Sequence, residues 1–115
     1  MIRNKNNSEH YSWGDNCSGW FLVNTPELSV IEELMPPNTA EKEHYHQFAQ
    51  QYFEIKSGIA TFKIEEEIIE VPSGSGIHIP PRTKHCIFNN GKSDLEFVVI
   101  SQPNTRGDRM EAPFH

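Results

Sequence analysis

Residues 44–51 have the sequence His44-Tyr45-His46-Gln47-Phe48-Ala49-Gln50-Gln51. In an extended chain, His44 and His46 lie on the same face because successive side chains of a strand alternate between faces. Neutral imidazole is the commonest metal ligand in proteins, so this pair offers two adjacent donors to a metal ion. By itself, a His-x-His pair is more often two exposed polar residues than a metal site.

A second segment supplies a third histidine. Residues 74–89 have the sequence G-S-G-I-H-I-P-P-R-T-K-H-C-I-F-N, in which His85 follows a Pro-Pro turn. Together the two segments resemble the paired sequence motifs of the cupin superfamily. The first motif, Gly-x5-His-x-His-x3or4-Glu-x6-Gly, falls on His44, His46, Gln51 and Gly58. The second, Gly-x5-Pro-x-Gly-x2-His-x3-Asn, falls on Gly74, Pro80, His85 and Asn89.

Every spacing in these parts fits, and three residue types depart from the motifs. Asn38 stands where the opening glycine belongs, Gln51 where the acidic ligand belongs, and Arg82 where the second motif has glycine. The resemblance covers residues 28–101 and implies an all-β fold, a double-stranded β-helix (jelly-roll or cupin barrel) in a single domain. Turn signals recurring about every ten residues also favour an all-β sandwich or barrel.

The resemblance places the barrel at residues 25–101. We expect residues 1–24 to pack on it as an N-terminal segment, and residues 102–115 to form an irregular C-terminal tail that wraps the barrel or a partner. One stretch is ambiguous: Thr25 as N-cap, Pro26 in the first turn and an apolar stripe from Leu28 to Met35 are typical of a helix. The resemblance requires a strand there, and we follow it.

Composition excludes several classes of protein. The formal net charge is −6, and the ten basic residues form no cluster, so we expect no nucleic-acid partner. We also expect no membrane partner, since no apolar stretch is long enough to cross a bilayer. The polar N-terminus shows no secretion signal, and the two cysteines are expected to be reduced thiols. The expected location is the cytoplasm.

The resemblance implies a metal site made of His44, His46 and His85, with Gln51 as a fourth ligand and open positions for water or substrate. Three imidazoles and one oxygen suit one divalent first-row ion: Fe, Mn, Ni, Cu or Zn. An amide at position 51 leaves the charge of such a site at +2, where a carboxylate would reduce it to +1. The alternatives are a facial array of three histidines without Gln51, or no metal at all.

Strand alternation predicts the rest of the pocket. If Gln51 points inward, which requires a bulge or turn over residues 47–50, then Phe53 and Ile55 point inward too. Ile87 shares a face with His85, whereas His78 fits either the pocket or the outer face. The expected pocket residues are therefore Phe53, Ile55, His78 and Ile87. Such a pocket is largely apolar and binds a small molecule by few polar contacts. No catalytic acid or base can be assigned.

Three functions are compatible with this site. The first is a metal-dependent enzyme, a dioxygenase or an isomerase, acting on a small anionic, oxygen-rich molecule. The second is a non-catalytic module that binds or senses a small ligand, and the third is a structural or storage β-barrel. We also expect a homodimer, because outward-facing Tyr45, Tyr52 and Phe88 would otherwise leave apolar surface exposed.

Overall fold

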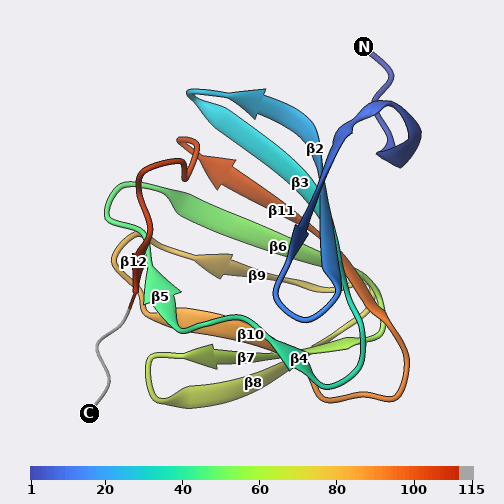
Figure 1. Ribbon diagram of the computed structural model, residues 1–115. Coiled ribbons are helices and arrows are strands. Elements are labelled where there is room, and N and C mark those ends of the chain that lie inside the picture. The colour runs from blue at the N-terminus through green and yellow to red at the C-terminus, as the bar shows by residue number, and fades with distance from the viewer. Residues whose placement is uncertain (112–115) are drawn as a thin grey trace.

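The computed structural model describes residues 1–111, which form two antiparallel β-sheets packed face to face (Figure 1). A short 3-10 helix, η1 (Lys5–Asn7), precedes the strands. The strands are β1 (Glu9–Trp13), β2 (Cys17–Thr25), β3 (Leu28–Met35), β4 (Thr39–Ala40), β5 (His44–Tyr45), β6 (Gln50–Ser57), β7 (Ile59–Ile64), β8 (Glu67–Pro72), β9 (Gly76–Ile79), β10 (His85–Asn89), β11 (Leu95–Gln102) and β12 (Met110–Glu111). Of the expected tail at residues 102–115, the last four residues lie outside the described part.

The order of the strands is that of a jelly roll. The first sheet has the order β1-β2-β3-β11-β6-β9 and the second β12-β5-β10-β7-β8, with β4 also paired to β10. Strands far apart in the sequence, such as β3 and β11, are neighbours in one sheet (Figure 1). The predicted all-β jelly-roll fold is confirmed. Within residues 1–111, no helix has the length and apolar character needed to cross a membrane.

The ambiguous stretch at residues 28–35 is strand β3. It pairs with β2 along one edge and with β11 along the other, so its main-chain polar groups are satisfied from both sides. Local helix preference is worth only a few tenths of a kcal/mol per residue, and tertiary pairing overrides it. The strand required by the family resemblance is therefore the one observed.

The core lies between the two sheets. Its largest fully buried apolar side chains are Phe62, Phe97, Met35, Ile55, Ile79, Ile87 and Leu95. Phe53 joins the two layers, because its ring lies 5.1 Å from the Phe62 ring in the second sheet and 5.7 Å from the Phe97 ring in the first. Each such side chain contributes about 1.5–3 kcal/mol through its removal from water. The core occupies one part of the barrel and leaves the end near β5 free for polar residues.

The four positions that are glycine in the family motifs share one backbone conformation. The φ angle is 64° at Asn38, 88° at Gly58, 84° at Gly74 and 60° at Arg82. Left-handed backbone costs a residue with a Cβ about 1–2 kcal/mol, and asparagine tolerates it better than arginine. Asn38 and Arg82 therefore preserve the turns although their residue types differ. At Arg82 the turn is held by its N–H, which donates to the His46 carbonyl at 2.7 Å.

We predict that Arg82→Gly raises the free energy of unfolding by about 1 kcal/mol, because glycine adopts this φ without steric strain. The gain is partly offset by the greater freedom of glycine in the unfolded chain. Urea unfolding of the two proteins measures the difference. Glycine at Thr83, the next residue, whose φ is not positive, is the control and should destabilise. A loss of stability in Arg82→Gly would show that the arginine side chain matters more than the backbone.

Candidate functional site

Three histidines converge at one end of the barrel. His44 begins β5, His46 follows it, and His85 begins β10 directly opposite His44 in the ladder. All three are buried, and one nitrogen of each lies within 4.8 Å of one nitrogen of the others. The ring centroids are 4.5–5.7 Å apart. The structure thus brings together the three histidines that the two motifs contribute.

The ring orientation is fixed by main-chain carbonyls. His44 Nδ1 contacts the Lys42 carbonyl oxygen at 2.7 Å. His46 Nδ1 contacts that of Asp108 at 2.5 Å, and His85 Nδ1 contacts that of Thr83 at 2.8 Å. A carbonyl oxygen only accepts, so each Nδ1 carries the proton and each Nε2 presents a lone pair. Fixing the tautomer through the other ring nitrogen is the usual arrangement around a bound metal.

The Nε2 atoms of His46 and His85 differ in their surroundings. His46 Nε2 is buried and has no hydrogen-bond partner in the described part of the chain. His85 Nε2 faces the Oε1 atom of Gln51 at 3.1 Å, and the Gln51 amide donates to Ser101 Oγ at 3.0 Å. Two acceptors at this distance are stabilised by a cation that both can bind. The three histidines can therefore hold an ion, and the Gln51 oxygen lies beside them.

Burial keeps these rings neutral. It lowers the pKa of His44 to about 3 and that of His85 to about 4, and it lowers the pKa of His46 as well. The hydrogen bonds to the carbonyls act in the opposite direction but are outweighed. Only a neutral imidazole has a lone pair for a metal ion. The cluster is thus in the protonation state that divalent first-row ions require.

Asp108 fastens the C-terminal segment to the loop that carries His46. Its carboxylate accepts from three successive main-chain N–H groups, those of Gln47, Phe48 and Ala49, at 2.7–3.0 Å. The main-chain carbonyl of Asp108 accepts a hydrogen bond from His46 Nδ1. Burial of this carboxyl is outweighed by the three donors, so the pKa of Asp108 lies below its ordinary value. One residue therefore holds both the loop and the ring.

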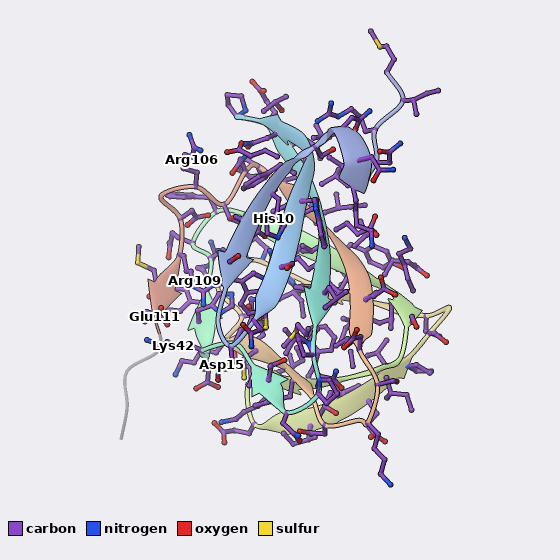
Figure 2. The ribbon with its side chains drawn as sticks, turned by 45° about the vertical axis from the view of Figure 1, so that its right-hand side comes forward. His10, Asp15, Lys42, Arg106, Arg109 and Glu111 are labelled. Carbon is purple, nitrogen blue, oxygen red and sulfur yellow. The ribbon has the colours of Figure 1, made fainter. Side chains whose placement is uncertain are left out.

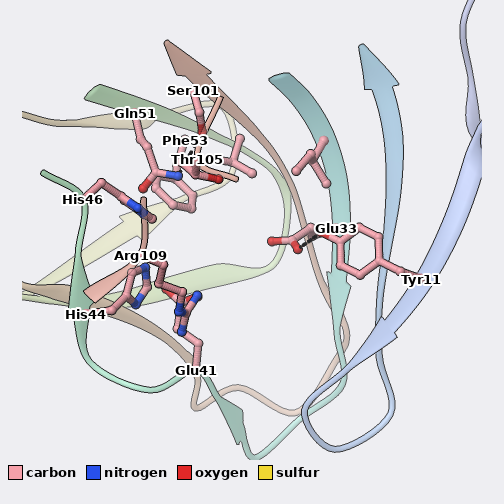
Figure 3. Close-up of a pocket in the computed structure, with 12 residues that line it drawn as sticks. Tyr11, Glu33, Glu41, His44, His46, Gln51, Phe53, Ser101, Thr105 and Arg109 are labelled. Atoms are coloured by element: carbon pink, nitrogen blue, oxygen red, sulfur yellow. Dashed lines mark hydrogen bonds and ion pairs between the residues drawn. The ribbon is translucent and has the colours of Figure 1, made fainter. Parts of the chain in front are cut away.

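A cavity of about 160 Å³ opens beside His44 and His46. Its lining is largely polar: Glu41 and Arg109 lie next to His44, whereas Glu33, with Tyr11 behind it, lies across the cavity from the histidines (Figure 3). Arg109 lies in the C-terminal segment near Glu111, whose partner in the β5–β12 ladder is His44 (Figure 2). Arg109 Nη1 is 3.9 Å from Glu41 Oε2, which is a weak ion pair. The cavity thus has ligand nitrogens, Arg109 and Glu41 on one side and Glu33 with Tyr11 on the other.

The pKa values of Glu33 and Glu41 lie near neutral pH. Burial raises the pKa of Glu33 to about 7, against the hydrogen bond from Tyr11 and the charge of Arg109, which lower it. Burial also raises the pKa of Glu41 to about 8, and the nearby Glu33 adds to that rise. A carboxyl group with a pKa near 7 can both give and accept a proton at physiological pH. These two carboxyl groups can perform acid–base chemistry.

The other expected pocket residues lie in different places. Phe53 lines the cavity, whereas Ile55 and Ile87 are buried in the core behind it. His78 is exposed, and its Nε2 contacts Gln50 Oε1 on the outer face of the first sheet. The cavity lining is also less apolar than the sequence analysis predicted, because Glu33, Glu41 and Arg109 line it. The alternation of side chains along one strand does not specify which distant segments lie next to it.

Sequence reasoning missed eight residues that line the cavity, of which four are ionisable: Tyr11, Glu33, Glu41 and Arg109. Only Glu33 left a signal in the sequence. It lies between Ile31 and Met35 at alternate positions of a strand, where the inward-facing side chain should be apolar. A charged residue at such a position indicates a polar cavity or a buried partner.

Comparison with known proteins agrees with the observed fold. The family model of the cupin domain matches residues 31–101. An uncharacterised protein of Methanocaldococcus jannaschii is 31% identical over 75 residues, which cover 65% of this chain and 60% of that protein. The chain spans between 12% and 60% of the length of the curated relatives it matches.

Among solved structures, KdgF from a Halomonas species has a TM-score of 0.83 at 14% identity, with 93% of this chain and 98% of that chain covered. The nucleoside dehydratase Pac13 of Streptomyces has a TM-score of 0.81 at 16% identity, with 99% and 92% covered. At these identities the likeness shows the fold.

We predict that Asp108→Asn lowers the free energy of unfolding by about 1.5–3 kcal/mol, the usual worth of hydrogen bonds to a charged group. The amide has one acceptor oxygen where the carboxylate has two, and its NH2 group opposes the main-chain donors of the loop. Urea unfolding measures the loss. Asp94→Asn removes an exposed carboxylate and is the matched control. Equal stability of the two variants would contradict a structural role for the Asp108 carboxylate.

Proposed function

Because the chain belongs to the cupin family, whose model covers residues 31–101, we propose that it is a metal-dependent cupin enzyme acting on a small anionic, oxygen-rich molecule. The ion is one divalent first-row metal held by His44, His46 and His85, with the amide oxygen of Gln51 as a fourth ligand. The observation that carries this proposal is the arrangement of three buried rings whose Nδ1 atoms all contact carbonyls, which leaves three Nε2 atoms close together beside the cavity that His44 and His46 line.

The donor set favours an anionic ligand. Three neutral imidazoles and an amide contribute no negative charge, so a divalent ion there keeps its +2 charge. Such an ion supplies Lewis acidity to whatever oxygen it binds. Beside His44, Arg109 provides a second positive group, and its pairing with Glu41 at 3.9 Å is weak enough to be exchanged for a ligand carboxylate. Small hydroxy acids, keto acids and sugar-like acids carry both an oxygen chelate and a negative charge.

An enzyme is favoured over a binding module because of two glutamates that line the cavity, Glu33 and Glu41. A ligand carrier needs contacts, but it does not need two carboxyl groups with pKa values raised to about 7 and 8 beside the ligand. Structural neighbours such as the dehydratase Pac13 include enzymes, which supports catalysis on this fold. A structural or storage role leaves the three oriented histidines unexplained.

We also predict a homodimer. We propose that its two chains contact each other through the outer face of the first sheet. Tyr52 and Ile100 are exposed there, on the neighbouring strands β6 and β11. With Leu28 and His78 they line a shallow, largely apolar groove. A second copy of the chain would remove this surface from water.

The protein is predicted to carry about one first-row ion per chain, because its donor set matches the ligand preference of these metals. Elemental analysis of protein purified without chelators or a nickel column should show it. His46→Ala combined with His85→Ala should abolish it, while His10→Ala, an exposed histidine, should not. Full metal content in the double variant would refute the site.

Gln51→Glu should tighten metal binding in a competition titration, by about tenfold if the carboxylate enters the coordination shell. Gln50→Glu, the exposed neighbour, is the matched control.

Small acids should raise the melting temperature of the metal-loaded protein, because a ligand that binds only the folded state stabilises it by mass action. Oxalate, malonate and glycolate are suitable probes, with neutral benzene and cyclohexanol as controls. The shifts should vanish in His46→Ala and persist in His10→Ala. Shifts of equal size with the neutral compounds, or acid shifts that survive in His46→Ala, would contradict recognition through the metal. Shifts without turnover of any bound acid would favour a binding module.

A further inference from the structure

Three neighbouring strands place a tyrosine and a glutamate together at the cavity. Tyr11 on β1 pairs with Gly19 on β2, and Gly19 pairs with Glu33 on β3, so the three residues lie in one row across the sheet. The Tyr11 hydroxyl donates to Glu33 Oε2 at 2.5 Å, reaching over the strand between them. Figure 3 shows the Glu33 carboxyl group pointing into the cavity toward the wall that carries the histidines.

Gly19 makes this contact possible. The Tyr11 ring occupies the space where a Cβ at position 19 would lie, so any other residue there would overlap the ring. The ring also stacks at 4.9 Å from Phe21, which fixes its position on the sheet. Glycine within a strand weakens it, and a close approach by another group is the usual reason for its presence. The row is therefore built to bring the tyrosine hydroxyl to Glu33.

Glu33 is an acid–base group whose position is fixed by the hydrogen bond from Tyr11. The pKa of Tyr11 is raised far above its ordinary value by burial and by the charge of Glu33, so its hydroxyl stays protonated and always donates. This donation fixes Oε2 of Glu33 and leaves Oε1 for a molecule in the cavity. The other groups that face Glu33 are Glu41 and Arg109, whose charges oppose each other. Proton transfer requires a positioned acid–base group of this kind.

We propose that Glu33 is the acid–base residue of the cavity, that Tyr11 and Gly19 are its positioning residues, and that the reaction is proton transfer next to a carbonyl group. This rests on the proposed function, since the substrate carbonyl is held at the histidine side. Glu33 Oε1 takes the proton from the carbon next to the carbonyl. The C–H electron pair becomes the C=C bond of an enolate, which is an enediolate where that carbon bears a hydroxyl group, and the carbonyl π pair moves onto oxygen.

Return of a proton from Glu33, which exchanges with solvent while the carboxyl group holds it, completes the reaction. Delivered to the neighbouring carbon of an α-hydroxy carbonyl compound, it gives the isomeric carbonyl compound after a proton moves between the two oxygens. Delivered to the first carbon, it regenerates the starting compound. Neither course consumes an oxidant or a reductant. The substrate class is thus small α-hydroxy carbonyl compounds and keto acids, whose far oxygens can contact Arg109.

Deuterium uptake from heavy water tests the proposal without knowledge of the natural substrate. The probes are dihydroxyacetone, glyceraldehyde, hydroxypyruvate and pyruvate, each incubated with Zn²⁺-loaded protein and analysed by mass spectrometry. At least one should take up deuterium faster than in the absence of protein. Glu33→Gln should lower that rate by about 10²–10⁴-fold, the usual contribution of a general acid–base. Glu70→Gln, an exposed glutamate on β8, should leave it unchanged.

Tyr11 and Gly19 have a separate readout. Without the tyrosine hydroxyl the carboxylate form of Glu33 loses a hydrogen bond, so the pKa of Glu33 rises. The exchange rate, which needs the carboxylate, should therefore begin to increase at higher pH in Tyr11→Phe. Gly19→Ala should shift the profile in the same direction, because it displaces the ring. A variant that merely loosened the fold would lower the rate without moving the profile.

Metal content and ligand-induced melting shifts, measured on the same samples, separate the two proposals. A wild-type protein that binds metal and acids but exchanges none of the four probes refutes the assignment of proton transfer and leaves the metal site standing. Exchange by Glu33→Gln at the wild-type rate refutes the role of Glu33. A wild-type protein that binds neither metal nor acid refutes the proposed function and this inference together.

Discussion

The hydrogen bonds from three histidine Nδ1 atoms to main-chain carbonyls are the constraint on which the candidate site depends. Each carbonyl belongs to a segment outside the regular strands, so three loops must hold fixed positions relative to one another. The jelly roll achieves this by pairing His44 directly with His85 and by tying the loop after β5 to the turn at Arg82. The rings then need no reorganisation to present their lone pairs to one point, which is the condition for tight coordination.

The cavity is lined by two sets of residues that the chain supplies in different ways. The histidines come from two segments whose spacing is visible in the sequence. Tyr11, Glu33, Glu41 and Arg109 come from β1, β3, the segment after β4 and the C-terminal segment. Because burial raises the pKa values of Glu33 and Glu41, this second set does not carry two full negative charges. The glutamates thus do not cancel the charge of an ion that the three histidines could hold.

Much of the fold and of the histidine cluster could be predicted, because they depend on short-range spacing. Two motifs place His44, His46 and His85, and their turns need a left-handed backbone that Asn38 and Arg82 supply despite lacking the flexibility of glycine. The strand at Leu28–Met35 was predictable only through the family resemblance, since its local pattern is helical and pairing with β2 and β11 decides its conformation.

The rest of the site follows from sheet register, which single-sequence patterns do not specify. Tyr11 meets Glu33 because three strands align in one row, and Asp108 meets the loop at residues 47–49 across about sixty residues of chain. His78 is a residue whose position could not be predicted from the alternation of side chains along a strand. Strand parity left both faces of β9 open, and the structure places this histidine on the outer one.

The fastening by Asp108 has a consequence for how the protein matures in the cell. Ribosomes synthesise the three histidines before residue 108, so the loop at residues 47–49 must wait for its carboxylate, and the His46 ring for its carbonyl acceptor. Until that segment emerges, the ring is free to rotate and the barrel end is uncovered. The ordered histidine cluster therefore forms only once residue 108 has been synthesised, and a nascent polypeptide stalled earlier would lack the fixed orientation of the His46 ring.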